Sequence, residues 1–364
     1  MSIIIFIVIL LVLVLAHEFG HFFTAKRFGI RVDEFGFGFP PKVFSFKKGE
    51  TLYSFNLLPI GGFVKIFGET PDEENMNGPD AGRSFINKPK YQQAIVLFAG
   101  IFANFLLAWV LFSFGFMSGL PTSIDSQVKG YPLENVSLVV VSVEAQSPAF
   151  KAGLKSGDKI ISVNTSTDSI GEINPTTLKS FVVSHGSKEI DIGYTRGRNP
   201  EVNIAKMTPA NTAGQPTIGI SMDEIGTAKL PILKAFSEGM KLTISVTKGT
   251  VIGLYGLIRD AVRGHGSLAS VTGPVGLVGI VGDAYQFGFA YLLSFAALIS
   301  INLAIINIIP FPALDGGRLF FLLIEKIKGS AINPKVANTA NMIGFGLLIL
   351  MMLIVTYHDV VKLF

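Results

Sequence analysis

Long apolar runs separated by polar stretches are the dominant pattern of this chain. Residues 3–16 hold fourteen consecutive apolar side chains, and residues 94–117, 287–309 and 336–357 contain no charged residue. A helix needs roughly 20 mainly apolar residues to cross a bilayer. The pattern therefore predicts four transmembrane helices, placed within residues 1–25, 91–120, 285–317 and 336–358.

Residues 26–90 separate the first two predicted helices and have a strand-like pattern. Phenylalanine alternates with glycine in 35–39, Pro40-Pro41 interrupts the alternation, and two further strand-like runs follow around a polar turn at 47–50. The segment is unusually apolar for a loop. Backbone at membrane depth is tolerated where it pairs with itself or borders a cavity. We therefore expect a membrane-reentrant β-hairpin within this loop.

The longest polar stretch lies between the second and third predicted helices. Residues 131–224 alternate between strand and helix patterns and predict a compact α+β domain. Residues 229–280 follow, and Lys and Glu interrupt the apolar positions of 231–263 too often for a comfortable span. We expect amphipathic helices on the membrane surface there. A fifth and sixth crossing is the alternative.

Composition and charge agree with a multi-pass membrane protein. The chain is 49% hydrophobic and 15% charged, and its net charge of +4 gives no signal for nucleic-acid binding. Lys and Arg cluster after the first helix, before the second, and in the 318–335 loop between the third and fourth. The positive-inside rule then places residues 26–90 and 318–335 in the cytoplasm. Both termini and the 131–224 domain are expected outside.

The first predicted helix ends in the motif His-Glu-Phe-Gly-His at 17–21. His17 and His21 are four residues apart, so both imidazoles lie on one helix face and can reach a single zinc ion. Glu18 is placed to accept a proton from an attacking water. The alternative is a helix end whose polar groups only reach towards the interface.

A catalytic zinc ion needs a third protein ligand. The chain has no cysteine, so the ligand must be a histidine or a carboxylate. Asp315 closes the third predicted helix, where Pro310 and Pro312 break the helix and predict an extended stretch, with Gly316-Gly317 allowing a tight turn. Helix capping is the alternative role for Asp315. The remaining histidines, which lie in segments assigned to the far side, are excluded: His185, His265 and His358.

These motifs together resemble the site-2 protease family, in its bacterial regulator-of-sigma-E protease branch. The string SPAFKAGLKSGDKIISVN at 147–164 is similar to a bacterial PDZ domain, so one such domain is expected outside the membrane. The resemblance implies that zinc is bound by His17, His21 and Asp315, with Glu18 as catalytic base. It also implies substrate contacts for Asn302 and Asn307 and for an edge strand at Gly36, Phe37 and Gly38. An interhelical hydrogen bond is the alternative role of either asparagine.

The expected fold is a multi-pass α-helical membrane protein with four transmembrane helices, a membrane-associated β-hairpin and an inserted extracytoplasmic PDZ domain. The resemblance implies an intramembrane zinc endopeptidase of the bacterial cytoplasmic membrane, with its active site near the cytoplasmic side. Its substrate would be a transmembrane protein or peptide, either an anti-sigma factor or a remnant signal peptide. The PDZ domain would bind a peptide or act only as a spacer. A zinc transporter and an inactive PDZ scaffold are the alternatives.

Overall fold

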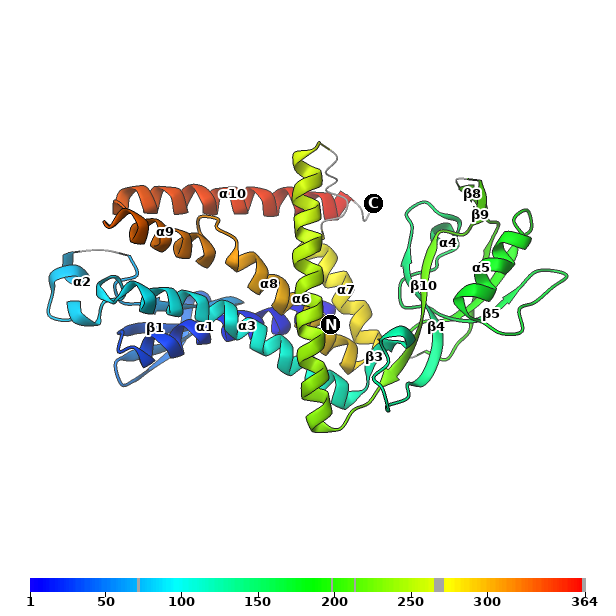
Figure 1. Ribbon diagram of the computed structural model, residues 1–364, viewed down its shortest axis with the longest axis horizontal. Helices are drawn as coiled ribbons and strands as arrows, with labels where there is room; N and C mark the ends of the chain where they lie inside the picture. Colours follow the sequence, from blue (N-terminus) through cyan, green and yellow to red (C-terminus); the bar gives the residue numbers. More distant parts are fainter. Residues whose placement is uncertain (71–72, 198, 213, 265–271, 362–364) are drawn as a thin grey trace. The chain divides into compact units, whose positions relative to one another are not determined.

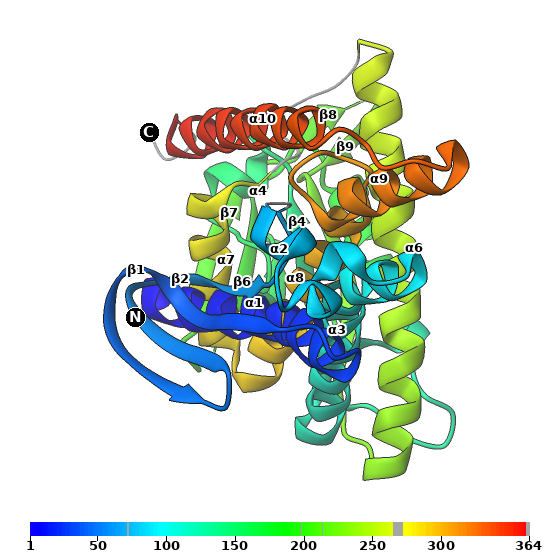
Figure 2. The same cartoon turned by 90° about the vertical axis from the view of Figure 1, so that its left-hand side faces the viewer.

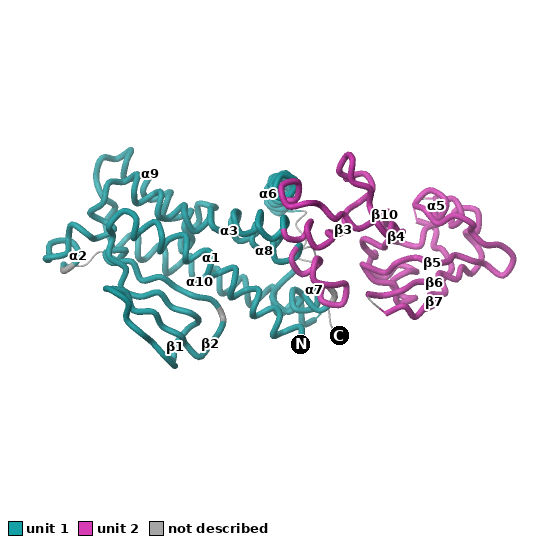
Figure 3. The backbone as a smooth tube through the Cα atoms, turned by 90° about the horizontal axis from the view of Figure 1, so that it is seen from below, with its two compact units in different colours: residues 1–113, 236–282, 294–364 teal, residues 114–235, 283–293 magenta. Residues whose placement is uncertain are grey.

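The computed structural model describes residues 1–364 except 71–72, 198, 213, 265–271 and 362–364, so His265 lies outside the described residues. The chain divides into two compact units, which Figure 3 shows in two colours. Unit 1 comprises residues 1–113, 236–282 and 294–364, and unit 2 comprises residues 114–235 and 283–293.

Four described helices are long and apolar enough to cross a membrane. They are α1 (Ser2–Arg27), α3 (Lys90–Ser118), α8 (Phe289–Ile308) and α10 (Pro334–Val361). Each predicted span falls on one of them, so the predicted multi-pass helical fold is confirmed. Only 11% of the most apolar window of α1 or α10 is buried. Such apolar exposure is expected of helices whose solvent is lipid.

Three further helices accompany them: α6 (Ile232–Val262), α7 (Pro274–Phe287) and α9 (Asp315–Lys328). Figure 1 shows α6 running crosswise to α1, α3 and α10. The Trp109 indole N–H donates to the Phe236 carbonyl at 2.8 Å, which ties α3 to α6. The first part of the predicted loop at 318–335 is helical, because residues 318–328 continue α9.

Two long, bent strands lie between α1 and α3. β1 (Val32–Lys48) and β2 (Thr51–Ile66) pair antiparallel, and both are seen beside α1 in Figure 2. The first half of β1 lies between the two halves of β2, because Gly36 pairs with both Ser54 and Phe63. The second half of β1 folds back onto the first half of β2. Several large apolar side chains of this sheet are exposed, namely Val43, Phe44, Phe46, Leu57 and Leu58.

A buried apolar cluster joins the end of α1, the sheet and the start of α3. Its members are Ala25, Ile30, Val32, Ile66, Phe85, Val96 and Leu97. Three short helical segments complete this region: α2 (Glu73–Asn77), η1 (Ala81–Arg83) and η2 (Phe85–Asn87). The cluster fixes the sheet against the half of α1 that carries the His-Glu-Phe-Gly-His motif.

Unit 2 is built on a six-stranded antiparallel sheet with the strand order β3-β10-β4-β5-β6-β7. These strands are β3 (Leu120–Ser123), β4 (Glu134–Val143), β5 (Lys159–Asn164), β6 (Ile190–Thr195), β7 (Asn203–Met207) and β10 (Ile220–Ala228). The other elements are η3 (Ile124–Ser126), α4 (Pro148–Lys151), α5 (Pro175–Ser184), β8 (Ala210–Thr212) and β9 (Gln215–Thr217). The predicted inserted α+β region is therefore present.

Local signals explain helices α4 and α5 of unit 2. The Ser147 hydroxyl accepts from the Phe150 amide at 3.1 Å and caps α4, and Asn174 and Thr177 form a capping box at α5. Apolar residues of the strands and of α5 share one core, which includes Leu138, Val140, Val163, Leu178, Ile190 and Ile192. Within β4 and β6, the pairs Leu138 and Val140, and Ile190 and Ile192, are alternating positions, as expected of strands with a buried face.

Candidate metal centre

The two histidines of α1 point at each other's ring nitrogens. His17 Nε2 and His21 Nε2 are 3.2 Å apart, as the four-residue spacing on one helix face predicts. His21 is buried and His17 is half-buried. The two nitrogen atoms therefore converge on one point beside the helix.

Asp315 brings its carboxylate to the same point from the other end of the chain. Its Oδ2 lies 3.1 Å from His17 Nε2 and 3.3 Å from His21 Nε2. The prediction that Asp315 lies in an extended stretch is wrong: the helix break covers residues 309–314, and Asp315 is the first residue of α9. Leu314 takes the N-cap position, so Asp315 does not cap the helix.

Gly316 and Gly317 do not form the predicted tight turn. They lie in the first turn of α9, pressed against carbonyl groups of the preceding break. A Cβ added at Gly317 would lie 2.7 Å from the Phe311 carbonyl carbon, and one at Gly316 would overlap the Ile308 and Ile309 carbonyls. The missing side chains let α9 begin against the end of α8. This close approach sets the position of Asp315.

The spacing of the three atoms matches a zinc site. Two ligands at about 2.0–2.1 Å from one tetrahedral zinc ion are about 3.3 Å apart. The three observed separations, 3.1, 3.2 and 3.3 Å, are all close to that value. Asp315 Oδ2 and His17 Nδ1 are also buried without a hydrogen bond among the described residues. A buried carboxylate oxygen and two imidazole nitrogens that face one point are donors that zinc prefers, so the donor set fits a zinc ion.

The His21 ring packs against α3. Its Nδ1 lies 2.8 Å from the Val96 carbonyl oxygen, which accepts the Nδ1–H and leaves Nε2 free to bind a metal. Gly100, one turn further along α3, packs directly against the imidazole: an added Cβ would lie 2.6 Å from Cε1 and 2.8 Å from Cδ2. The sequence offered no signal for the role of this glycine, because His21 and Gly100 lie on different helices and are 79 residues apart in sequence.

The sheet passes over Glu18. A Cβ added at Gly62 would lie 3.9 Å from Glu18 Cγ and 3.2 Å from a methyl carbon of Leu15, so β2 crosses α1 at the predicted catalytic base. The expectation that the Gly36 strand is an edge is wrong. Gly36 and Phe37 pair with β2 on both sides, because the chain folds β1 between the two halves of its partner.

The two sequence-predicted asparagines, Asn302 and Asn307, both lie on α8 and are half-buried. Asn307 directly precedes Ile308, whose carbonyl packs on Gly316. Asn307 is therefore the nearer of the two to the turn that carries Asp315.

Sequence reasoning missed Asn104 on α3. Its side chain is fully buried, and neither its Nδ2 nor its Oδ1 has a hydrogen bond among the described residues. An unpaired buried amide costs about 1–3 kcal/mol. Asn104 lies one turn beyond Gly100, and helical side chains lean towards the N-terminus, which brings this amide towards the His21 contact. The available signal was one polar amide within the uncharged run 94–117.

Known proteins resemble this chain along nearly its whole length. Residues 5–351 match the model of peptidase family M50. The zinc metalloprotease RasP of Geobacillus kaustophilus is 32% identical over 100% of this chain and 98% of its own length. The regulator of sigma-W protease RasP of Bacillus subtilis is 32% identical, with 100% and 99% covered. A zinc metalloprotease RasP of Bacillus licheniformis is 33% identical with the same coverage.

The predicted resemblance to the site-2 proteases is confirmed by these matches, and with it the prediction of a zinc-dependent membrane peptidase. The match spans both spanning-helix motifs, the His-Glu-Phe-Gly-His segment and Asp315. The chain belongs to peptidase family M50.

Proposed function

We propose that His17, His21 and Asp315 bind one zinc ion and that Glu18 is the base of an intramembrane endopeptidase. The reaction is hydrolysis of a peptide bond within or near the transmembrane segment of a membrane protein. The observation that carries the proposal is the convergence of two imidazole nitrogens and one carboxylate oxygen at 3.1–3.3 Å. All three belong to elements at one end of the spanning helices.

Each residue of the site has a distinct task. A zinc ion bound there supplies Lewis-acid chemistry, acidifying a water molecule and polarising the scissile carbonyl. The Glu18 carboxylate takes a proton from the attacking water and later gives it to the leaving amine, a role that typically contributes 10²–10⁴-fold to the rate. The Val96 carbonyl keeps the His21 ring in the metal-binding tautomer. We assign the amide of Asn307 or Asn302 the role of donating to the developing oxyanion, and Asn307 is the closer of the two in sequence to Asp315.

The substrate must be extended before water can reach its peptide bonds. We place it on the outer edge of the Gly62–Ile66 half of β2. Among the described strand pairings, this half has a partner on one side only. A chain added there exchanges lost helical hydrogen bonds for sheet hydrogen bonds, and it lies about 4.8 Å from the strand that crosses Glu18. The Gly36–Gly38 segment then supports the substrate strand from the opposite side of β2.

Unit 2 supports a peptide-binding role. A pocket of about 300 Å³ lies between α5 and the start of β10, with apolar walls that include Leu178, Val182, Ile218 and Ile220. A groove between a helix and a strand is what peptide addition to a PDZ domain requires. The alternative role of unit 2 is to exclude bulky substrates without a ligand of its own.

Location and substrate follow from the charge pattern and the relatives. We place the chain in a bacterial cytoplasmic membrane with both termini and unit 2 outside, from the Lys and Arg residues near the metal site. The crosswise course of α6 in Figure 1 supports a helix lying along the outer surface. One relative is named a regulator of sigma-W protease. The substrate we expect is therefore an anti-sigma factor, with a remnant signal peptide as the second candidate.

Replacing Glu18 by glutamine tests the proposal, with a purified membrane-spanning substrate and zinc analysis on the same sample. We expect cleavage to fall by at least a hundredfold while zinc content stays at one ion per chain. A zinc transporter would keep its transport activity in this variant, and a scaffold would show no cleavage in the unmodified chain. Cleavage at the original rate by Glu18→Gln refutes the assigned role of Glu18.

A further inference from the structure

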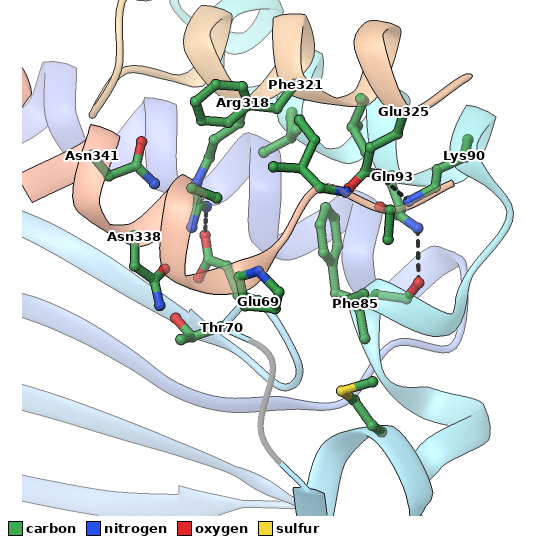
Figure 4. A pocket seen from close by; sticks show the side chains of 18 residues that line it. Glu69, Thr70, Phe85, Lys90, Gln93, Arg318, Phe321, Glu325, Asn338 and Asn341 are labelled. Atoms are coloured by element: carbon green, nitrogen blue, oxygen red, sulfur yellow. Dashed lines mark hydrogen bonds and ion pairs between the residues drawn. The ribbon is translucent and has the colours of Figure 1, made fainter. Parts of the chain in front are cut away.

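A separate pocket of about 240 Å³ lies beside α9 (Figure 4). Its walls come from α3, α9, the start of α10 and the segment that follows β2. The apolar part of the lining includes Phe85, Leu97, Phe321, Leu322 and Ile332. Small-molecule and cofactor sites commonly measure about 300–1,000 Å³. This pocket holds the equivalent of about eight water molecules, which suits a side chain of a polypeptide.

Three walls of this pocket are tied to the metal centre. Leu97 follows Val96, whose carbonyl accepts from the His21 ring. Arg318 lies one turn after Asp315 on the same helix. On α10, Asn341 Oδ1 accepts from the Ala313 amide at 3.1 Å, two residues before Asp315. A group bound in the pocket therefore touches the elements that position two of the three predicted zinc ligands.

Two ion pairs bound the pocket, and both are drawn in Figure 4. Arg318 pairs with Glu69, and Lys90 Nζ lies 2.5 Å from Glu325 Oε2. Each cation already has a carboxylate partner, so a charged side chain would have to displace one of them. An uncharged apolar side chain meets no such competition, and it gains by leaving water.

The pocket continues the strand edge on which we place the substrate. Glu69 and Thr70 line the pocket and follow Ile66 of β2 by three and four residues. A chain that runs along the Gly62–Ile66 edge is thus led towards them.

We propose that this pocket is a substrate subsite, which takes one uncharged apolar side chain of leucine or phenylalanine size from the segment flanking the scissile bond. The inference rests on the proposed function and adds a determinant of substrate choice. It assigns this specificity to α9 and α10.

A pocket-filling variant tests this subsite. Ala337 lines the pocket from α10, so Ala337→Trp fills it, whereas Met342 on the same helix is 70% exposed and outside the lining. The substrates are membrane-spanning peptides that carry leucine or alanine at each flank position in turn. With the unmodified enzyme, we expect leucine at one position to give a kcat/KM about tenfold above alanine. Ala337→Trp should abolish this preference, chiefly through KM, and leave the alanine substrate unchanged.

The control and the contrary outcomes are distinct. Met342→Trp should keep the leucine preference of the unmodified enzyme. If Ala337→Trp does not fold, Ala331→Trp fills the same pocket from the residues before α10. A filled pocket that keeps the leucine preference, or that slows both substrates equally, overturns the subsite. An unmodified chain that cleaves no membrane-spanning substrate contradicts the proposed function instead.

Discussion

Gly100→Ala is a one-carbon change that should weaken zinc binding. The new methyl carbon would lie 2.6 and 2.8 Å from two ring carbons of His21. Carbon atoms need about 3.5–4.0 Å, so the ring must move by about 1 Å. It cannot turn aside freely, because its Nδ1–H donates to the Val96 carbonyl at 2.8 Å. Metal–ligand distances deviate from their usual values by only about 0.2 Å.

The expected loss is at least that of a change behind a metal ligand, which is about 10–100-fold in zinc affinity. This range corresponds to about 1.4–2.7 kcal/mol. A competitive chelator titration measures the dissociation constant, and thermal unfolding monitors the fold. Gly346→Ala on α10 is the matched control, because a Cβ there meets nothing within 4 Å. Both changes raise helix propensity equally. If Gly100→Ala binds zinc as tightly as Gly346→Ala, our placement of His21 is refuted.

Three further predictions concern residues that do not bind the metal. Asn104→Leu removes an unpaired buried amide. The free energy of unfolding should therefore rise by up to about 1–3 kcal/mol, while cleavage slows. A loss of stability in urea unfolding would contradict this prediction. Asp359→Ala removes the carboxylate that accepts a hydrogen bond from an N-terminal amide of α7 at 2.8 Å. The free energy of unfolding should fall by about 1–3 kcal/mol. An unchanged unfolding midpoint would contradict this prediction. Lys26 and Arg83 hold the pKa of Glu50 below its ordinary value. The stabilisation is therefore present above the unfolded pKa of 4.5 and is lost as the pH falls through the lower, folded pKa. Unfolding midpoints measured from pH 7 to 3 should depend less on pH in Glu50→Gln, and equal slopes would be contrary evidence.

Sequence patterns predicted the spanning helices and the motif geometry because both depend on local spacing. Hydrocarbon thickness sets the length of a span, so an uncharged run such as 94–117 marks α3 without knowledge of its neighbours. The face shared by His17 and His21 follows from the helical repeat alone. Local alternation also predicted an α+β region within residues 131–224, where the structure has strands and helices.

The rest depends on contacts between segments far apart in sequence. Alternation in residues 35–39 predicts a strand but not its neighbours, and the pairing of Gly36 with both Ser54 and Phe63 came from the fold. The prolines at 310 and 312 marked a helix break but did not locate the start of α9 at Asp315. That start depends on the packing of Gly316 against the end of α8, which one segment alone does not encode.

In the proposed site, one zinc ion joins α1 to α9 through His17, His21 and Asp315. X-ray absorption at the zinc edge tests it directly, on the purified chain and on Asp315→Ala. We predict two imidazole nitrogens and additional oxygen ligands at about 2.0–2.2 Å in the unmodified chain, with weakened zinc binding and an altered oxygen shell in the variant. Zinc bound without imidazole, or an identical spectrum and affinity in both proteins, would refute this set of ligands.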